Sequence, residues 1–280
     1  MSPLWRDEVQ LLLTPRRVAL RRRARGLRPV LVQAAQSDVA HGQDLHWSAP
    51  LEALAALLRA AAARGADATV VLSSHFVRHG LVPESELLVT HDDALRFARH
   101  NFMRIHGAAA ERWSVRVSEG DGAEGGSGLA SGIEQELVDA LRALLVAHGL
   151  RPRALQPLLM AAFNQARPLL PKGGCRLVVL EPDIAVSALL QPGWRRVHSQ
   201  RLAGPAADEL QRLIERERLQ DDEPPAGHVT CVLPLQPLPQ PVPEAADLRV
   251  LAPLWPDAQP AGVARARRGA KAADTGGAAT

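Results

Sequence analysis

The sequence contains one glycine pattern that matches a dinucleotide-binding fingerprint, Gly120-Asp121-Gly122-Ala123-Glu124-Gly125. In such a G-x-G-x-x-G run, backbone N–H groups approach a pyrophosphate at the start of a helix. Asp121 and Glu124 would place two carboxylates beside that anion, which opposes binding. The acidic partner for a ribose, expected about 20 residues later, is replaced by Leu145 and Val146. We therefore expect a solvated loop here.

The other familiar catalytic and metal-binding patterns are incomplete. A phosphate-binding G-x-x-x-x-G-K-[ST] loop does not occur in the sequence. Ser73, Ser74 and His75 lack the G-x-S-x-G turn of a hydrolase nucleophile, and no acid can be assigned to orient the histidine. His75 and His79 have the spacing of two helical metal ligands, but Pro83 and the preceding predicted strand argue against a helix there. We expect neither hydrolysis nor metal binding at these positions.

Two short turns between predicted strands hold the remaining polar candidates. The first turn is Thr14-Pro15-Arg16, which has no acidic residue and no glycine. The second turn is Glu181-Pro182-Asp183, in which two acids stand two residues apart. Taken alone, this acidic pair is typical of a solvated turn between strands.

The elements that position these turns recur twice in the same order. Alternating and apolar runs predict strands at 8–13, 18–23 and 29–35, a helix from Ser48 to about Gly65, and a strand at 69–73. The second unit repeats that order, with strands at 175–180, 184–190 and 194–202, a helix at 205–219 and a strand at 229–233. The sequence therefore predicts a duplicated unit of three strands, a helix and a strand.

Further elements are predicted between and after the two units. Thr90 and Asp93 form a capping-box pattern that starts a helix ending at Gly107. A strand at 113–118 and a glycine-rich loop lead to a long helix, whose apolar face would include Leu129, Ile133 and further leucines up to Gly149. A short strand at 151–155 and a helix at 157–167 link the two units, and a last strand is possible at 248–251.

Composition indicates a folded protein. The chain has 280 residues, 46% of them hydrophobic, and a formal net charge of +3. No apolar stretch approaches the roughly 18 uncharged residues of a membrane span, and no secretion signal is recognisable, so we expect a cytoplasmic protein. Cys175 and Cys231 lie in strand-like apolar runs, which predicts reduced core residues. An N-terminal arginine cluster could bind an anionic surface or nucleic acid, although it has no interleaved aromatic residues: Arg16, Arg17, Arg21, Arg22, Arg23, Arg25 and Arg28.

Three groups of residues, together with the duplicated plan, carry a resemblance to a known family. They are Ser73-Ser74-His75-Phe76-Val77-Arg78, His100-Asn101-Phe102 with Gly107 and Trp113, and Leu155-Gln156-Pro157 with Ala161-Ala162-Phe163-Asn164. The plan resembles the actin and hexokinase class, in which a nucleotide lies between two ribonuclease-H-like halves. Within that class the chain is similar to the cytoplasmic actin-like proteins of type IV pilus and type II secretion assembly, the PilM and GspL group, over about residues 4–219.

The resemblance implies a nucleotide cleft, but both turns depart from the pattern it requires. In nucleotide-binding members of the class, the turn after the first strand of each half carries Asp and Gly, which orient magnesium and let amides approach phosphates. Here the first turn has neither, and Pro15 has no N–H to donate. The second turn keeps acids at Glu181 and Asp183 but has no glycine. We therefore expect no ATP or magnesium cofactor and no ATPase activity.

The expected fold is α/β and actin-like, with duplicated ribonuclease-H-like βββαβ units. Residues 1–155 would form the first half with an inserted subdomain, 156–255 a shorter second half, and 256–280 a disordered tail. The resemblance implies a non-catalytic cytoplasmic scaffold for a type IV pilus or type II secretion-like apparatus. Such a scaffold would be held at the inner membrane by a small single-span membrane partner and other platform proteins. Two alternatives stay open: an active nucleotide-binding actin-like ATPase, and a nucleic-acid-binding module that uses the N-terminal arginines.

Overall fold

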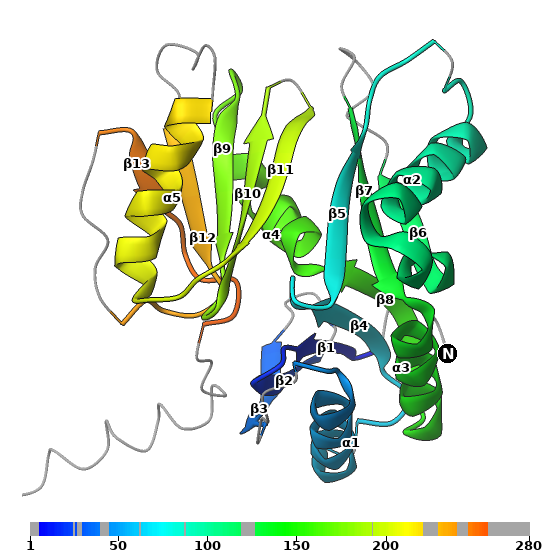
Figure 1. Cartoon of the computed structure of the whole chain (residues 1–280). Helices are drawn as coiled ribbons and strands as arrows, with labels where there is room; N and C mark the ends of the chain where they lie inside the picture. Colours follow the sequence, from blue (N-terminus) through cyan, green and yellow to red (C-terminus); the bar gives the residue numbers. More distant parts are fainter. Residues whose placement is uncertain are drawn as a thin grey trace, which may run out of the picture.

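The computed structural model describes residues 6–24, 26, 30–39, 45–61, 63–86, 88–118, 127–191, 193–220, 229–239 and 246–256. These residues form two halves that lie side by side, with a smaller subdomain above the first half (Figure 1). The glycine pattern at 120–125 and nearly all of the tail predicted from residue 256 lie outside the described residues.

The first half is built on a five-stranded sheet with the order β3-β2-β1-β4-β8. Strand β1 (Glu8–Leu13) pairs antiparallel with β2 (Arg17–Ala24), and β2 pairs antiparallel with β3 (Val30–Asp38). Strand β4 (Asp67–Leu72) is parallel to β1, and β8 (Arg151–Pro157) is parallel to β4. Helices α1 (Ser48–Ala61) and α3 (Gln135–Ala147) supply apolar side chains to the core on one face of this sheet.

The second half repeats the same plan with the order β11-β10-β9-β12-β13. Strands β9 (Cys175–Leu180), β10 (Ile184–Leu190) and β11 (Trp194–Arg201) form an antiparallel meander, and β12 (Val229–Pro234) and β13 (Leu248–Val250) follow in parallel. Helix α5 (Ala206–Gln220) packs on one face through Leu210, Leu213 and Ile214. Cys175 and Cys231 are buried and free, as the sequence predicted. The duplicated order of elements is therefore confirmed.

The inserted subdomain is a three-stranded sheet with the order β5-β7-β6, covered by helix α2 (His91–His106). Its strands are β5 (Val77–Val82), β6 (Trp113–Ser118) and β7 (Gly128–Glu134), and a short 3-10 helix, η2 (Gly107–Arg112), precedes β6. The capping box of α2 is present, because Thr90 and Asp93 each bond the backbone N–H of the other.

One element was predicted wrongly and one was not predicted. The long helix expected to include Leu129 and Ile133 is in fact strand β7 followed by α3, and β5 was not foreseen. Strand β7 lies between β5 and β6 and is buried over most of its length, so its apolar run carries no alternation that would separate it from a helix. Gly132 leaves room for the ring of Trp113, because a Cβ atom at this position would lie only 2.8 Å from that ring and would clash with it.

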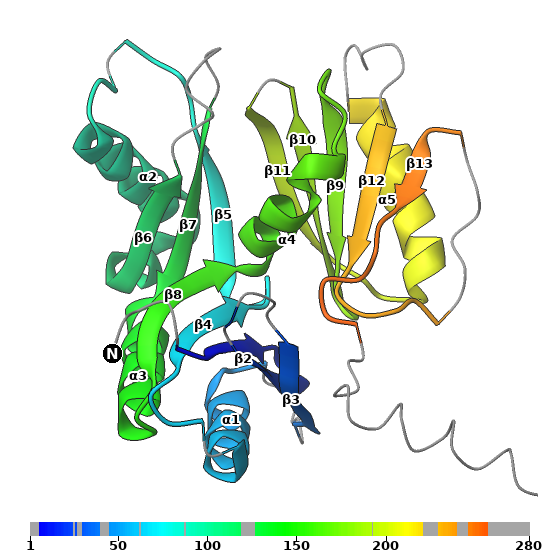
Figure 2. The same cartoon turned by 180° about the vertical axis from the view of Figure 1, so that it is seen from behind.

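A shared core joins the two halves. Leu12 and Val71 on the second face of the first sheet pack in one cluster with Leu177 of β9 and with helix α4 (Leu158–Ala166). Both views show α4 between the two sheets (Figures 1 and 2). The last described residues add to this junction: the Trp255 ring packs in the same cluster, and the guanidinium of Arg21 in β2 lies 4.2 Å from its centroid.

Candidate functional site: the contact between the two turns

The turn between β1 and β2 is closed by its own hydrogen bonds. The Thr14 N–H and hydroxyl both donate to the Arg17 carbonyl, at 3.0 and 2.8 Å. The Arg17 N–H donates in return to the Thr14 hydroxyl oxygen at 2.9 Å. Because Pro15 has no N–H, most donors of this turn are already used or missing. The Arg16 side chain is left to reach across to the second half.

The equivalent turn between β9 and β10 faces the first half with its two acids. The Asp183 carboxylate forms a salt bridge with the Arg16 guanidinium, at 2.6 Å. The Glu181 carboxylate accepts a hydrogen bond from the Ser73 hydroxyl and another from the Ser74 N–H, the latter at 2.8 Å. Both serines follow the last residue of β4. The two turns predicted from the sequence therefore meet through the Arg16–Asp183 salt bridge, and Glu181 adds two hydrogen bonds from the residues after β4.

The two contacts differ in their exposure to solvent. Glu181 is only 3% exposed, and Ser73 and Ser74 are buried. The Arg16 and Asp183 side chains are 49% and 31% exposed, so their ion pair is screened by water. The expectation of a solvated acidic turn is therefore wrong for Glu181, because packing of the second half against β4 removes its carboxylate from water.

Burial governs the protonation of the groups around this contact. It raises the pKa of Glu181, while hydrogen bonds from Ser73 and Ser74 act to lower that pKa and the Asp183 charge acts to raise it. Burial also lowers the pKa of His75 to about 4; Asp183 opposes this effect, and nearby arginines reinforce it. His75 is therefore neutral at pH 7 and adds no charge to the contact.

His79, the other histidine considered as a metal ligand, is bonded within the inserted subdomain. His79 lies on β5 with Nδ1 3.2 Å from the Ser131 hydroxyl, and burial lowers its pKa to about 4. Within the described ranges, no group of three or more His, Cys, Asp or Glu residues could hold a metal ion. No helix of the described part of the chain is both long and apolar enough to cross a membrane.

The N-terminal arginines are largely bonded within the protein. Arg17 pairs with Asp38 at 2.9 Å, and Arg22 pairs with Asp7 at 2.6 Å. Arg21 is buried against Trp255 and donates to the Pro256 carbonyl. These partners, together with the Arg16 salt bridge, leave little of the described cluster as a continuous basic surface.

Ser73 and Ser74 were set aside as an incomplete hydrolase motif, and their role as partners of Glu181 was missed. A signal was available in the sequence, because two small polar residues directly after a buried strand are suited to cap a neighbouring acid. Their connection to residue 181 depends on how the halves pack, which no local pattern reveals.

A separate groove of about 370 Å³ lies between β8, α3 and the strands β6 and β7 of the inserted subdomain. Strand β8 is an outer strand of the first sheet. The lining of the groove combines an apolar floor with three arginines, Arg116, Arg142 and Arg153. The apolar lining includes Val70, Val117, Leu141, Leu145, Leu155 and Met160.

Comparison with solved structures defines the class of fold. The duplicated halves, the meander and the inserted subdomain together form an actin-like fold, which confirms the class expected from the sequence. The chain matches the cytoplasmic domain of EpsL, an inner membrane component of the Vibrio cholerae type II secretion system, with a TM-score of 0.57 and 13% identity. That match covers 88% of this chain and 89% of the EpsL domain.

Two further solved structures have the same fold. The PilM–PilN type IV pilus biogenesis complex matches with a TM-score of 0.56 and 17% identity, over 81% of each chain. A Bacteroides thetaiotaomicron protein with an actin-like ATPase fold matches with a TM-score of 0.56 and 9% identity, over 85% of this chain and 86% of that one. No protein-family model and no curated protein matches the sequence.

Proposed function

We propose that the protein is a non-catalytic actin-like scaffold for a type IV pilus or type II secretion-like apparatus. The contact between the two turns is the observation that carries this proposal. Arg16 and Asp183 neutralise each other, and the Ser73 hydroxyl and the Ser74 N–H both donate to Glu181. In an actin-like cleft those are the positions where an anionic nucleotide tail would need free donors.

The residues of the two turns do not suit magnesium and a triphosphate. A phosphate tail needs several N–H donors, whereas Thr14 and Arg17 already donate within their turn and both turns contain a proline. Magnesium would need a free carboxylate, but Glu181 is buried beneath two donors and Asp183 is paired. Binding of magnesium and a triphosphate would have to break the Arg16–Asp183 salt bridge and expose Glu181, and both changes cost free energy.

The groove beside β8 is the surface we assign to a membrane-protein partner. The support is that PilM occurs in a type IV pilus biogenesis complex with PilN, and that EpsL is an inner membrane component of a type II secretion system. An apolar floor beside an outer strand suits an extended or helical peptide segment. On this proposal, the chain is cytoplasmic and is held at the inner membrane by the cytoplasmic segment of a small single-span protein.

Nucleotide binding is tested by titrating the full chain with magnesium and ATP in a calorimeter. The expected result is no saturable heat at millimolar ATP and no release of phosphate. Micromolar binding that Glu181→Ala abolishes, or steady phosphate release that Asp183→Ala abolishes, would establish the active ATPase instead.

Partner binding is tested with a synthetic peptide of the cytoplasmic segment of a single-span membrane protein encoded by a neighbouring gene. Leu155→Arg places a charge in the groove and should weaken binding at least tenfold. Val89→Arg is the matched control, because Val89 is 82% exposed and outside the groove. Equal affinity of the two variants would exclude the groove as the partner site.

A further inference from the structure

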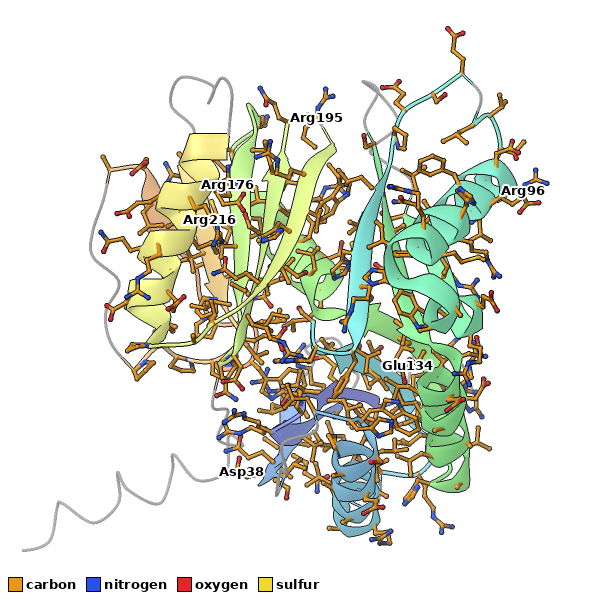
Figure 3. The ribbon with its side chains drawn as sticks, in the orientation of Figure 1. Asp38, Arg96, Glu134, Arg176, Arg195 and Arg216 are labelled. Atoms are coloured by element: carbon orange, nitrogen blue, oxygen red, sulfur yellow. The ribbon has the colours of Figure 1, made fainter. Side chains whose placement is uncertain are left out.

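A second cavity, of about 400 Å³, opens where the two halves and the inserted subdomain meet. Its walls come from the segment before α1, the turn after β4, the ends of β7 and β11, and the start of α3. It shares no lining residue with the groove beside β8. Glu134, labelled in Figure 3, marks its position beneath the inserted subdomain.

Two tryptophans line this cavity, and contacts within the protein hold both of them. The Trp47 Nε1–H donates to the Glu134 carboxylate at 2.7 Å, and the Trp47 ring lies 4.7 Å from that of His46. The Trp113 ring lies 5.7 Å from Phe102 in an edge-to-face arrangement. Because these rings are already ordered, a ligand that covers them loses little side-chain entropy on binding.

Two guanidinium groups give the cavity a positive side. Arg78, at the start of β5, donates through Nη1 to the carbonyls of His75 and Val77, at 3.1 Å each. Arg201 lies at the end of β11. The pKa of Arg78 is lowered mainly by burial and further by the nearby charge of Arg201. Among the described residues, neither guanidinium has a carboxylate within salt-bridge distance. The Glu134 carboxylate, whose charge acts to raise the pKa of Arg78, accepts a hydrogen bond from Trp47.

Two arginines and one glutamate in the lining favour an anion with a single charge. A carboxylate carries a single charge and matches the planar fork of a guanidinium. A polyphosphate would bring several negative charges toward Glu134, and the described lining contains no lysine to offset them. Tryptophan and arginine are also among the residues most enriched at the positions that dominate the binding energy of protein interfaces.

We propose that this cavity binds an acidic peptide segment of a partner protein. An Asp or Glu side chain of the segment lies between Arg78 and Arg201, and a neighbouring apolar side chain packs against Trp47 and Trp113. The proposal goes beyond the scaffold function, because the cavity is separate from the groove and gives a second point of contact with different chemistry.

The test uses a phage-displayed library of random seven-residue peptides selected against the full chain. Selected peptides should be enriched in an Asp or Glu next to an aliphatic or aromatic residue. A synthetic copy of the best peptide is then titrated while tryptophan fluorescence is followed, which is a clean signal because the chain contains five Trp and no Tyr. Replacing its acid by the corresponding amide should weaken binding at least tenfold.

Variants of the protein locate the site. Arg201→Gln should weaken the peptide at least tenfold, whereas Arg195→Gln should not. Arg195 is an exposed arginine of the same strand that donates to the Gln191 carbonyl at the far end of β11 (Figure 3). The groove variant Leu155→Arg should bind the peptide normally, so failure of the proposed partner groove would leave this result intact.

Two outcomes would overturn the proposal. Selection without enrichment of acidic residues, or equal binding to the Arg201→Gln and Arg195→Gln variants, would show that the cavity does not recognise a carboxylate. Displacement of the peptide by micromolar pyrophosphate would assign the cavity to a phosphate ligand instead.

Discussion

Ser73→Ala should destabilise the protein by weakening the buried contact between its halves. The substitution removes the hydroxyl that donates to Glu181, while the Ser74 N–H at 2.8 Å remains. A hydrogen bond to a charged group contributes about 1.5–3 kcal/mol. Because Glu181 is only 3% exposed, water cannot replace the lost donor without opening the junction. We therefore expect a loss of about 1.5–3 kcal/mol in the free energy of unfolding.

The measurement is urea denaturation followed by tryptophan fluorescence and by circular dichroism. A loss of this size corresponds to a fall in melting temperature of about 3–12 °C for a protein near this length. Ser199→Ala is the matched control, since Ser199 is an exposed residue of β11. A difference of less than about 0.5 kcal/mol between the two variants would refute the reasoning, because surface substitutions already vary by that amount.

A double-mutant cycle separates the bond from other effects of the substitution. Glu181→Gln keeps the size of the side chain and removes the charge. If the Ser73 hydroxyl acts through Glu181, then Ser73→Ala should cost at least about 1 kcal/mol less in the Glu181→Gln background. If the losses of the two substitutions simply add, Ser73 stabilises the protein by another route. One such route is the hydrogen bond that the Ser73 hydroxyl oxygen accepts from the His75 N–H, at 3.2 Å.

Three further predictions concern buried charge and the junction of the halves. The raised pKa of Glu181 means that the folded protein keeps this proton to higher pH than the unfolded chain. The stabilisation from this proton is therefore fully present below the ordinary glutamate pKa of about 4.5, and it is lost as the pH rises through the pKa of the folded state. Urea denaturation at several pH values should show that Glu181→Gln removes this loss. Glu217→Ala removes the carboxylate that pairs with the Arg176 guanidinium, whose side chain is 2% exposed, and should cost about 3–5 kcal/mol in the free energy of unfolding. The double variant Arg176→Met with Glu217→Leu should recover most of this loss in the same assay. Trp255→Ala empties a buried ring site over Arg21 and should cost about 3–5 kcal/mol by thermal unfolding, with Trp255→Phe losing clearly less; equal losses would exclude the ring contact as the cause.

The sequence was most informative where local pattern and tertiary role agree. The strands at 8–13, 175–180 and 184–190 were predicted with the bounds that the structure shows, because apolar runs separated by proline-containing turns specify short strands. The helix that follows Thr90 was also found, since the capping box is a local arrangement of four residues.

Prediction failed where the same residues suit two structures. The segment Gly128–Glu134 has apolar residues at positions that fit a helical face as well as a central strand. Its pairing with β5 on one side and β6 on the other makes it a strand, and β5 lies far from it in the sequence. Strand β5 was missed for the same reason, because Arg78 and His79 make it look polar until the inserted sheet is assembled.

The two turns show the same division between sequence and structure. The sequence by itself determined their composition: no glycine in either turn, a proline in each, and acids only at Glu181 and Asp183. Only the tertiary structure decided that Glu181 is buried under Ser73 and Ser74 and that Asp183 meets Arg16. The physical reason is that backbone donors and turn chemistry are local properties, whereas desolvation and charge pairing depend on which surfaces the shared core of the two halves brings together.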